Sequence, residues 1–304
     1  LPFSEKKYPY INLLTAVLEQ KHGRLEQSEF DLREFLDIVP DDQRGLLLLS
    51  QLLHQQNRSA ESIQLLSDAL ERHPTNRKLR LQYARFLTTN TPSEAITQFE
   101  ILRTYNPKDQ EVNFLLGLTQ LSGGNVKAAE DLFKQASAEP SLRSDAQYHL
   151  GTISEKNGDL VAAMSHYTQV RFGRNYIAAA SRSSALLAQH KSMSQAQKYL
   201  QRMRLTQPSQ AVTLFQIESN LLLKAQSPSQ ALVVLSAGLD DFPNDPQLLY
   251  ARSMVAEQQD NFELAEQDLR AILAKDQNNA TVLNALGYTM ILHTERYEEA
   301  FELI

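Results

Sequence analysis

The chain has 304 residues, no cysteine and a formal net charge of −6 at pH 7. The lack of cysteine excludes disulfides, thiolate zinc ligands and cysteine nucleophiles. The acidic balance argues against nucleic acid as the main partner, because phosphate binding needs a basic surface. No apolar run approaches the roughly 18 residues of a membrane-spanning helix, and residues 1–10 are too polar and proline-broken to form a signal peptide.

Helical periodicity extends through the whole chain. After a leader (residues 1–9), helices are predicted over residues 10–22 and 25–39, and the pair Asp41-Asp42 caps the start of the next helix. Further helical units are predicted over residues 43–73, 75–105, 109–171 (two units), 210–276 (two units) and from residue 279 onward.

One part of the chain departs from this regularity. The spacing loosens around Arg171-Phe172-Gly173-Arg174, and the helix predicted over residues 176–189 is rich in Ala and Ser. Small side chains at that density predict either a thin wall or an unusually close approach of neighbouring helices.

The stretch Ser122–Glu139 shows the pattern that the rest of the chain repeats. It begins with a Gly-Gly turn, and Ala129, Phe133 and Ala136 follow at spacings that place them on one helix face. The small residues let a second helix approach closely while the ring fills the space between. The stretch is therefore half of a helix-turn-helix unit.

Equivalents of Ala129 recur at steps of 33 to 35 residues, at Ser28, Ser62, Ala95, Ala129, Ala163, Ala196, Ala231, Ala265 and Ala300. The residue four positions later is bulky in nearly every copy, at Leu32, Leu66, Phe99, Phe133, Tyr167, Leu200, Leu235 and Leu269. Many units are followed by a proline, expected to close the second helix of the pair, at Pro40, Pro74, Pro107, Pro140, Pro208 and Pro243.

A period of 34 residues is that of the tetratricopeptide repeat, and the chain resembles this family over essentially its whole length. Leu116-Gly117 with the Ala129 stripe fits one repeat, and Leu286-Gly287-Tyr288 opens the last, although no repeat has the family's tryptophan. The resemblance implies an all-α fold, a right-handed α-solenoid of about nine helix-turn-helix repeats forming a single domain over residues 1–304.

We expect the chain to be truncated at its C-terminal end. Ile304 falls inside the second helix of a repeat, whereas solenoids normally end in a polar capping helix. We therefore expect a fragment of a longer protein, whose uncapped end would permit self-association.

The resemblance also implies where a partner would bind. First helices line the inner side of such a solenoid, and the family register places a set of arginine, aromatic and asparagine side chains there. They are Arg44, Arg77, Arg80, Phe114, Tyr148, Asn220, Tyr250, Asn284 and Tyr288. Aromatic and arginine side chains often anchor interfaces, but the three tyrosines also suit packing between helices. No lysine completes a clamp for a C-terminal carboxylate beside Asn220 and Asn284.

No pattern indicates catalysis, a cofactor or a metal. The seven histidines do not form a His-Glu-x-x-His motif, and no Gly-Lys-Ser/Thr follows Gly123-Gly124. We therefore expect a non-enzymatic protein without catalytic, cofactor-binding or metal-binding residues.

The stretch from Asn284, which reads NALGYTMILHTERYEEAFELI, looks like the C-terminal repeats of proteobacterial outer-membrane tetratricopeptide lipoproteins. One group of these faces the periplasm and presents cell-wall hydrolases to a carboxyl-terminal processing protease. The resemblance implies an adaptor held to the membrane only by a lipid anchor upstream of residue 1. A cytosolic adaptor or assembly factor and the repeat arm of a larger enzyme are the alternatives.

Overall fold

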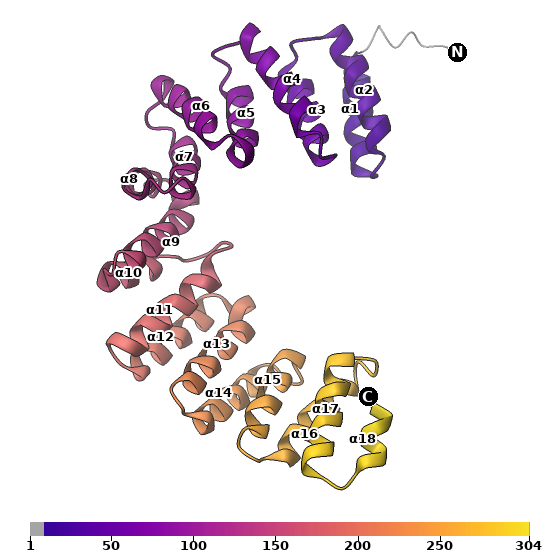
Figure 1. Cartoon of the computed structure of the whole chain (residues 1–304), viewed down its shortest axis with the longest axis vertical. Helices are drawn as coiled ribbons and strands as arrows, with labels where there is room; N and C mark the ends of the chain where they lie inside the picture. Colours follow the sequence, from indigo (N-terminus) through magenta and orange to yellow (C-terminus); the bar gives the residue numbers. More distant parts are fainter. Residues whose placement is uncertain (1–8, 304) are drawn as a thin grey trace. The chain divides into compact units, whose positions relative to one another are not determined.

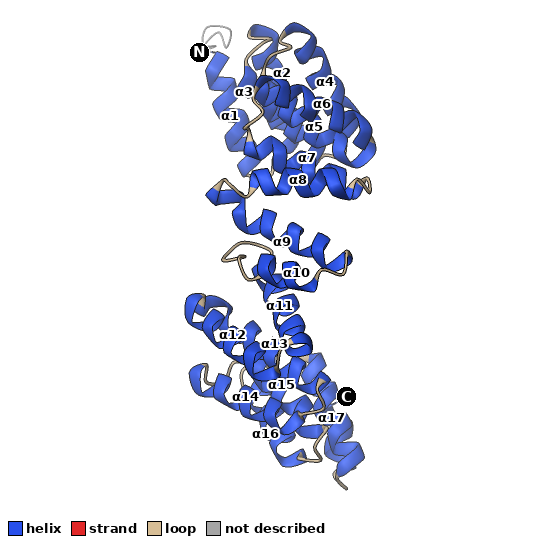
Figure 2. Cartoon of the chain, turned by 90° about the vertical axis from the view of Figure 1, so that its left-hand side faces the viewer, coloured by secondary structure: helices blue, strands red, loops and turns tan. Residues whose placement is uncertain are grey.

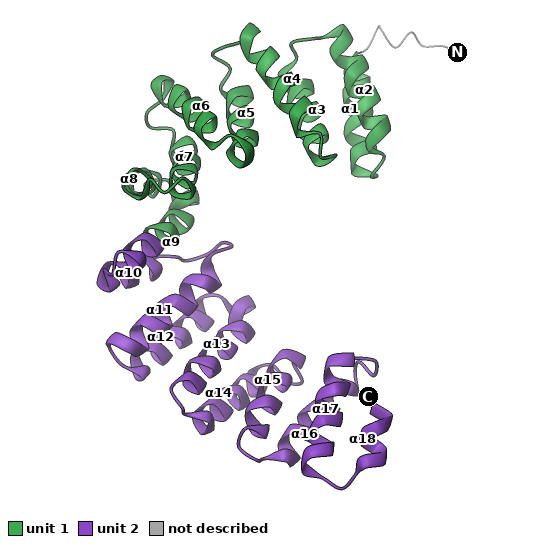
Figure 3. Ribbon diagram, in the orientation of Figure 1, with its two compact units in different colours: residues 1–150 green, residues 151–304 purple. Residues whose placement is uncertain are grey.

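The computed structural model describes residues 9–303, and within them every regular element is a helix (Figure 1, Figure 2). The chain divides into two compact units, residues 1–150 and residues 151–304 (Figure 3). The first unit contains α1 (Pro9–Lys21), α2 (Leu25–Ile38), α3 (Gln43–Gln55), α4 (Ser59–Arg72), α5 (Arg77–Asn90), α6 (Pro92–Tyr105), α7 (Gln110–Ser122) and α8 (Val126–Ala136).

Helix α9 (Pro140–Lys156) contains the division between the units. The second unit continues with α10 (Leu160–Tyr167), α11 (Tyr176–His190), α12 (Met193–Thr206), the short η2 (Pro208–Gln210), α13 (Ala211–Lys224), α14 (Pro228–Asp241), α15 (Pro246–Glu257), α16 (Phe262–Leu273), α17 (Ala280–His293) and α18 (Tyr297–Leu303). The predicted pairs of helices are thus present in order within each unit. The prediction of a single domain over residues 1–304 stays a prediction.

The small residue of each repeat is enclosed within its helix pair. All nine, from Ser28 to Ala300, are buried with no exposed surface, and the bulky residues four positions later are at most 1% exposed. In the two repeats that use serine, the hydroxyl is satisfied inside the pair. Ser28 Oγ donates to the Ala16 carbonyl at 2.8 Å, and Ser62 Oγ donates to the Ser50 carbonyl at 2.7 Å.

Glycine in the first helix provides room for the bulky ring of the second. A Cβ atom added at Gly117 would lie 3.0 Å from the Phe133 ring, and one at Gly151 would lie 2.7 Å from the Tyr167 ring. The Tyr167 hydroxyl donates to Glu155 at 2.8 Å, so its ring is fixed at both ends. The contact between a first-helix glycine and a second-helix ring is therefore part of the packing in these two repeats.

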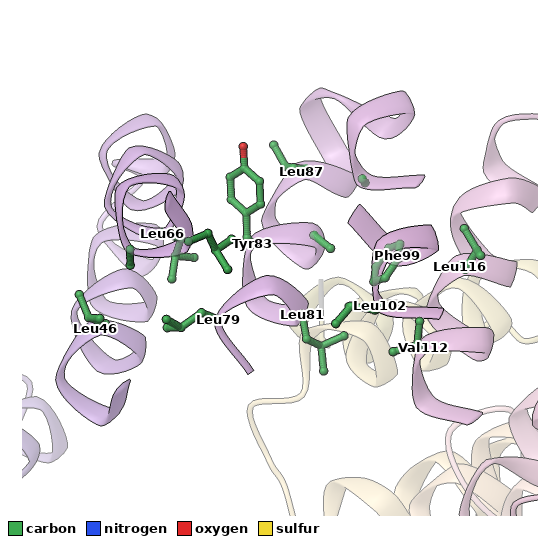
Figure 4. Packing of buried hydrophobic residues seen from close by; sticks show 14 of the residues in the cluster. Leu46, Leu66, Leu79, Leu81, Tyr83, Leu87, Phe99, Leu102, Val112 and Leu116 are labelled. Atoms are coloured by element: carbon green, nitrogen blue, oxygen red, sulfur yellow. The ribbon is translucent and has the colours of Figure 1, made fainter. Parts of the chain in front are cut away.

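The cores are built by stacking one pair on the next. Figure 4 shows the cluster that joins α3 to α7, with Leu46, Leu66, Leu79, Phe99 and Leu116 among its members. A similar cluster in the second unit extends from Phe215 on α13 to Ala300 on α18. Burying a leucine or phenylalanine contributes about 1.5–3 kcal/mol, so each pair depends on its neighbours for stability.

The repeat formed by α11 and α12 has a different interior. Ala179, Ala180, Ser183 and Ser184 of α11 are all at most 1% exposed. Small buried side chains favour a close approach of neighbouring helices over a thin wall. They also bury less apolar area per residue than the leucine-rich interior of the other repeats.

Sequence features at the helix ends behave as predicted except at two prolines. Asp42 caps α3 by accepting hydrogen bonds from the backbone N–H groups of Arg44 and Gly45. Pro140 and Pro208, expected to close second helices, instead begin α9 and the short η2. A proline at the first helical position needs no N–H partner, and its fixed φ suits a helix start. The predicted leader lies outside the described residues, except for Pro9, which begins α1.

The turn inside most pairs requires a residue in the left-handed region. The residues with positive φ at this point are Gly23, Asn57, Gly124, Gly158, Gln226 and Asp260. Glycine adopts this conformation without strain, whereas a residue with a Cβ atom is penalised. No helix among residues 9–303 combines the length and apolar character that a membrane span requires.

Replacing the small residue of a repeat should break its pair. We expect Ala129→Leu to lower the free energy of unfolding by about 2 kcal/mol or more, because an added isobutyl group has no space at a fully buried position. Ala128→Leu, one residue earlier on the exposed face of α8, is the matched control. Urea unfolding followed by circular dichroism measures both. Equal stabilities would contradict the close contact.

Relieving the turn strain at Gln226 should have the opposite effect. Its φ is 56°, so Gln226→Gly is expected to stabilise the protein by about 1 kcal/mol. Gln267→Gly, in the exposed interior of α16, should instead destabilise it by a similar amount because glycine is a poor helix former. Thermal unfolding of both variants separates the two effects, and a destabilised Gln226→Gly protein would argue against turn strain.

Candidate functional site

The predicted inner positions lie on the first helix of successive pairs. In the first unit, Arg44 and Arg77 are exposed, while Arg80, Phe114 and Tyr148 are half-buried. In the second unit, Asn220 and Asn284 are exposed. Tyr288 is 59% exposed, and Tyr250 is half-buried.

Acids of neighbouring residues lie beside the predicted Arg77 of this surface. The Arg77 guanidinium lies 2.6 Å from Asp109 and 2.7 Å from Glu111, and Arg85 lies 2.6 Å from Glu111. This network joins the starts of α5 and α7. The sequence places these acids in the next repeat, so reading one helix at a time missed the pairing.

The two other arginines are also engaged. Arg44 lies 3.1 Å from Asp42 and 5.0 Å from the centre of the Tyr10 ring. Arg80 donates to Gln98 and, at 2.6 Å, to the Pro74 carbonyl. Arg44 is thus paired with an acid, whereas Arg80 donates only to uncharged groups.

The aromatic candidates of the first unit belong to a ring cluster between repeats. Phe114 lies 5.7 Å from Phe133 and 6.0 Å from His149, and His149 stacks on Phe133 at 5.0 Å. Tyr148 meets the edge of the His149 ring at 5.5 Å. Packing between helices thus accounts for much of the surface of Phe114, as expected for the alternative role of such aromatics.

Three successive first helices of the second unit form a pocket of about 340 Å³. Gln216 of α13, Gln247 and Tyr250 of α15, and Thr281 of α17 line it. The remaining lining residues are Pro246, Ile272, Asn279 and Val282. We call these eight residues the first-helix pocket.

The first-helix pocket is uncharged and combines amides with apolar surface. The Gln216 side chain donates to the Gln247 carbonyl at 3.4 Å, and Asn279 caps α17 by accepting from the Val282 N–H at 3.2 Å. Tyr250 and the aliphatic side chains provide apolar contact. Such a surface suits a protein segment, whose backbone can bond to the amides while a side chain enters the pocket.

The prediction found this pocket only in part. Tyr250 lines it, whereas Asn220, Asn284 and Tyr288 lie on its helices but not in its wall. Ile272 was missed because it belongs to a second helix, α16, and the register of first helices carries no signal for it. Among residues 9–303, no group of three or more acidic or histidine side chains is arranged to hold a metal ion.

A protein-family model matches most of the repeats. The tetratricopeptide repeat model matches residues 13–77, 85–142, 124–180 and 218–280, which together are well over half of the chain. The chain belongs to the tetratricopeptide repeat family. Repeats of this kind generally mediate contacts between proteins, so a role as a protein-interaction scaffold is consistent with this membership.

A curated relative matches almost the whole chain. The TPR repeat-containing protein PA4667 of Pseudomonas aeruginosa is 33% identical over 303 residues, covering 98% of this chain and 51% of the relative. The chain therefore spans about half the length of that relative. The identity over so long a match places the two repeat arrays in one family, while the activity and partners of a longer protein are a separate question.

A solved structure shares the fold. The structure of pilF from Pseudomonas aeruginosa is 17% identical with a TM-score of 0.54, covering 66% of this chain and 93% of that chain. A tetratricopeptide repeat protein from Parabacteroides merdae is 16% identical with a TM-score of 0.49, covering 93% and 99%. At such identities the pilF likeness shows the fold alone.

The network at the start of α7 predicts a pH dependence. Burial alone would raise the pKa of Asp109, but hydrogen bonds from Arg77 and the Val112 N–H lower it below its ordinary value. Its contribution to stability is therefore complete above the ordinary pKa and is lost as the pH falls through the lowered one. Asp109→Asn should keep the helix cap but remove this pH dependence, so the stability difference from wild type should shrink toward pH 3.

Unfolding midpoints measured from pH 7 to pH 3 would test this. Asp37→Asn removes an exposed acid of α2 that has no ion pair among the described residues, and it is the control. A gap between wild type and Asp109→Asn that stays constant over this range would contradict the assigned role of Asp109.

Proposed function

We propose that this protein is a scaffold that holds a segment of a partner protein in the first-helix pocket. The observation that carries this is the convergence of α13, α15 and α17 on one uncharged pocket with an aromatic wall, Tyr250. A pocket built from three repeats can contact several residues of a partner at once, because each repeat contributes a separate side chain. The first unit offers fewer free groups, since its arginines are paired within the protein.

We further propose that the partner is a carboxyl-terminal processing protease of the periplasm, together with its cell-wall hydrolase substrates. The motif Asn284-Ala285-Leu286-Gly287-Tyr288 near the C-terminus supports this, through its likeness to lipoprotein adaptors. The long relative from Pseudomonas aeruginosa, a bacterium with a periplasm, is compatible with it. The proposal places the protein at the periplasmic side of the outer membrane, attached by a lipid anchor upstream of residue 1.

A crosslinking pull-down from a Gram-negative periplasmic extract, analysed by mass spectrometry, tests both the pocket as the binding site and the identity of the partner. We expect recovery of a processing protease and cell-wall hydrolases, reduced about tenfold or more by Tyr250→Ala, since aromatic anchors dominate interface energies. Tyr105→Ala is the matched control because Tyr105 is 60% exposed on α6, outside the pocket.

The outcomes separate the two levels of the proposal. Partners that depend on Tyr250 but are neither proteases nor hydrolases would overturn the periplasmic adaptor and keep the scaffold. Recovery that is equal for Tyr250→Ala and Tyr105→Ala would overturn the pocket as the binding site. Incorporation of radiolabelled palmitate into the full-length protein tests the lipid anchor independently.

A further inference from the structure

A long segment of the second unit contains no acidic residue. Between Asp159 and Glu218 there is no Asp or Glu, although the whole chain carries a net charge of −6. Seven basic residues occur in this interval, at Arg171, Arg174, Arg182, Lys191, Lys198, Arg202 and Arg204. The family model leaves residues 181–217 unmatched, so the sequence of this repeat also departs from the family pattern.

Within residues 9–303, two of these cations form ion pairs with a carboxylate, and four others do not. Arg182 lies 3.6 Å from Glu155, and Arg204 lies 2.6 Å from Glu218. Among the described residues, four others have no carboxylate within ion-pair distance, and all four are exposed. They are Arg174, Lys191, Lys198 and Arg202.

The helix before this repeat is unusually short. Helix α10 has 8 residues, whereas α12 and α14, the second helices of the next two pairs, have 14 each. The chain continues from α10 to α11 as a connection over residues 168–175 (Figure 1). Gln207 donates to the Arg171 carbonyl at 3.3 Å, and the Tyr176 hydroxyl donates to the Met203 carbonyl at 3.3 Å.

A pocket of about 360 Å³ lies between this connection and α12. Its wall is mainly apolar, with Tyr199, Met203 and Leu205 from α12, and Leu205 is 77% exposed. Arg171, Arg202, Thr168 and Thr206 complete the lining. Helix α10 ends at Tyr167, and Thr168 and Arg171 of the connection that follows it line the pocket.

We propose that this pocket, the second-helix pocket, binds an acidic protein segment that carries a large apolar side chain. The apolar side chain would enter between Tyr199, Met203 and Leu205, while its acidic neighbours pair with Arg202 and the exposed cations around it. The site lies on a second helix and is separate from the first-helix pocket, so it does not depend on the function proposed above.

The observations favour a protein segment over a nucleic acid. A nucleic acid would need a continuous row of cations along its backbone, whereas here two arginines stand beside an apolar wall. The net negative charge of the rest of the chain also opposes a long polyanion. A short acidic segment meets only the local charge, which is positive, and the exposed Leu205 gains contact from its apolar side chain.

Fluorescence anisotropy with the full chain tests the proposal. The probe is a labelled 12-residue peptide of Asp, Glu, Gly and Ser with one central Phe and a net charge of −5. We expect saturable binding that weakens about tenfold in Arg202→Glu and about fivefold in Leu205→Ser, in line with the loss of a charge pair and of an apolar anchor. Lys127→Glu, an exposed cation on α8 outside the segment, should change affinity less than about twofold and controls for net charge.

Two further probes test whether binding requires the apolar side chain and whether a nucleic acid of the same charge binds as well. The same peptide with Ser in place of Phe should bind about fivefold more weakly, because the apolar contact is lost. An oligothymidylate with the same charge should bind more weakly than the Phe peptide. Absence of saturable binding, equal binding of the oligothymidylate, or no effect of Leu205→Ser in a variant with native circular dichroism would each overturn the proposal.

Discussion

The close contact of two helices at one small side chain is the constraint on which this structure depends. Each pair closes over a residue no larger than serine, and a bulky residue one turn later fills the adjoining space. Any larger group at the first position separates the helices, and any smaller group at the second leaves a cavity. A pair closed in this way presents apolar surface only to the neighbouring pairs, so the chain extends by stacking and not by enlarging one core.

The sequence predicts the fold closely because that contact is local. Ala129 and Phe133 lie on one helix and meet a first helix only a dozen residues away, so spacing alone identifies the pair. The candidate site was predicted less well, because it depends on contacts between repeats. Arg77 could be placed on the right helix from its register, but its neutralisation by Asp109 and Glu111 involves the next repeat. Ile272 lies on a second helix, to which the register of inner positions does not apply.

Charge is distributed in two different ways along the chain. In the first unit, Arg77 and Arg85 are matched by acids across neighbouring helices, so these cations mainly join repeats. Between Asp159 and Glu218 the cations have few internal partners, which a sliding count of acids along the sequence would have revealed. A balanced average over the whole chain conceals this segment. Paired cations rigidify a scaffold, and unmatched exposed cations remain available to another molecule.

The small interior of α11 has a consequence for how the second unit unfolds. In a linear array, cooperativity passes from one repeat to the next through the apolar area that they share. Ala179, Ala180, Ser183 and Ser184 offer little of it, and the short α10 on one side offers little more. These four positions therefore add little to the coupling, which depends here on the cluster of Tyr176, Tyr199, Leu200, Met203 and Leu214. We expect opening fluctuations to be more frequent around α11 and α12 than in the leucine-rich repeats that follow. The repeat with unpaired cations would then also be the most adaptable segment of its unit.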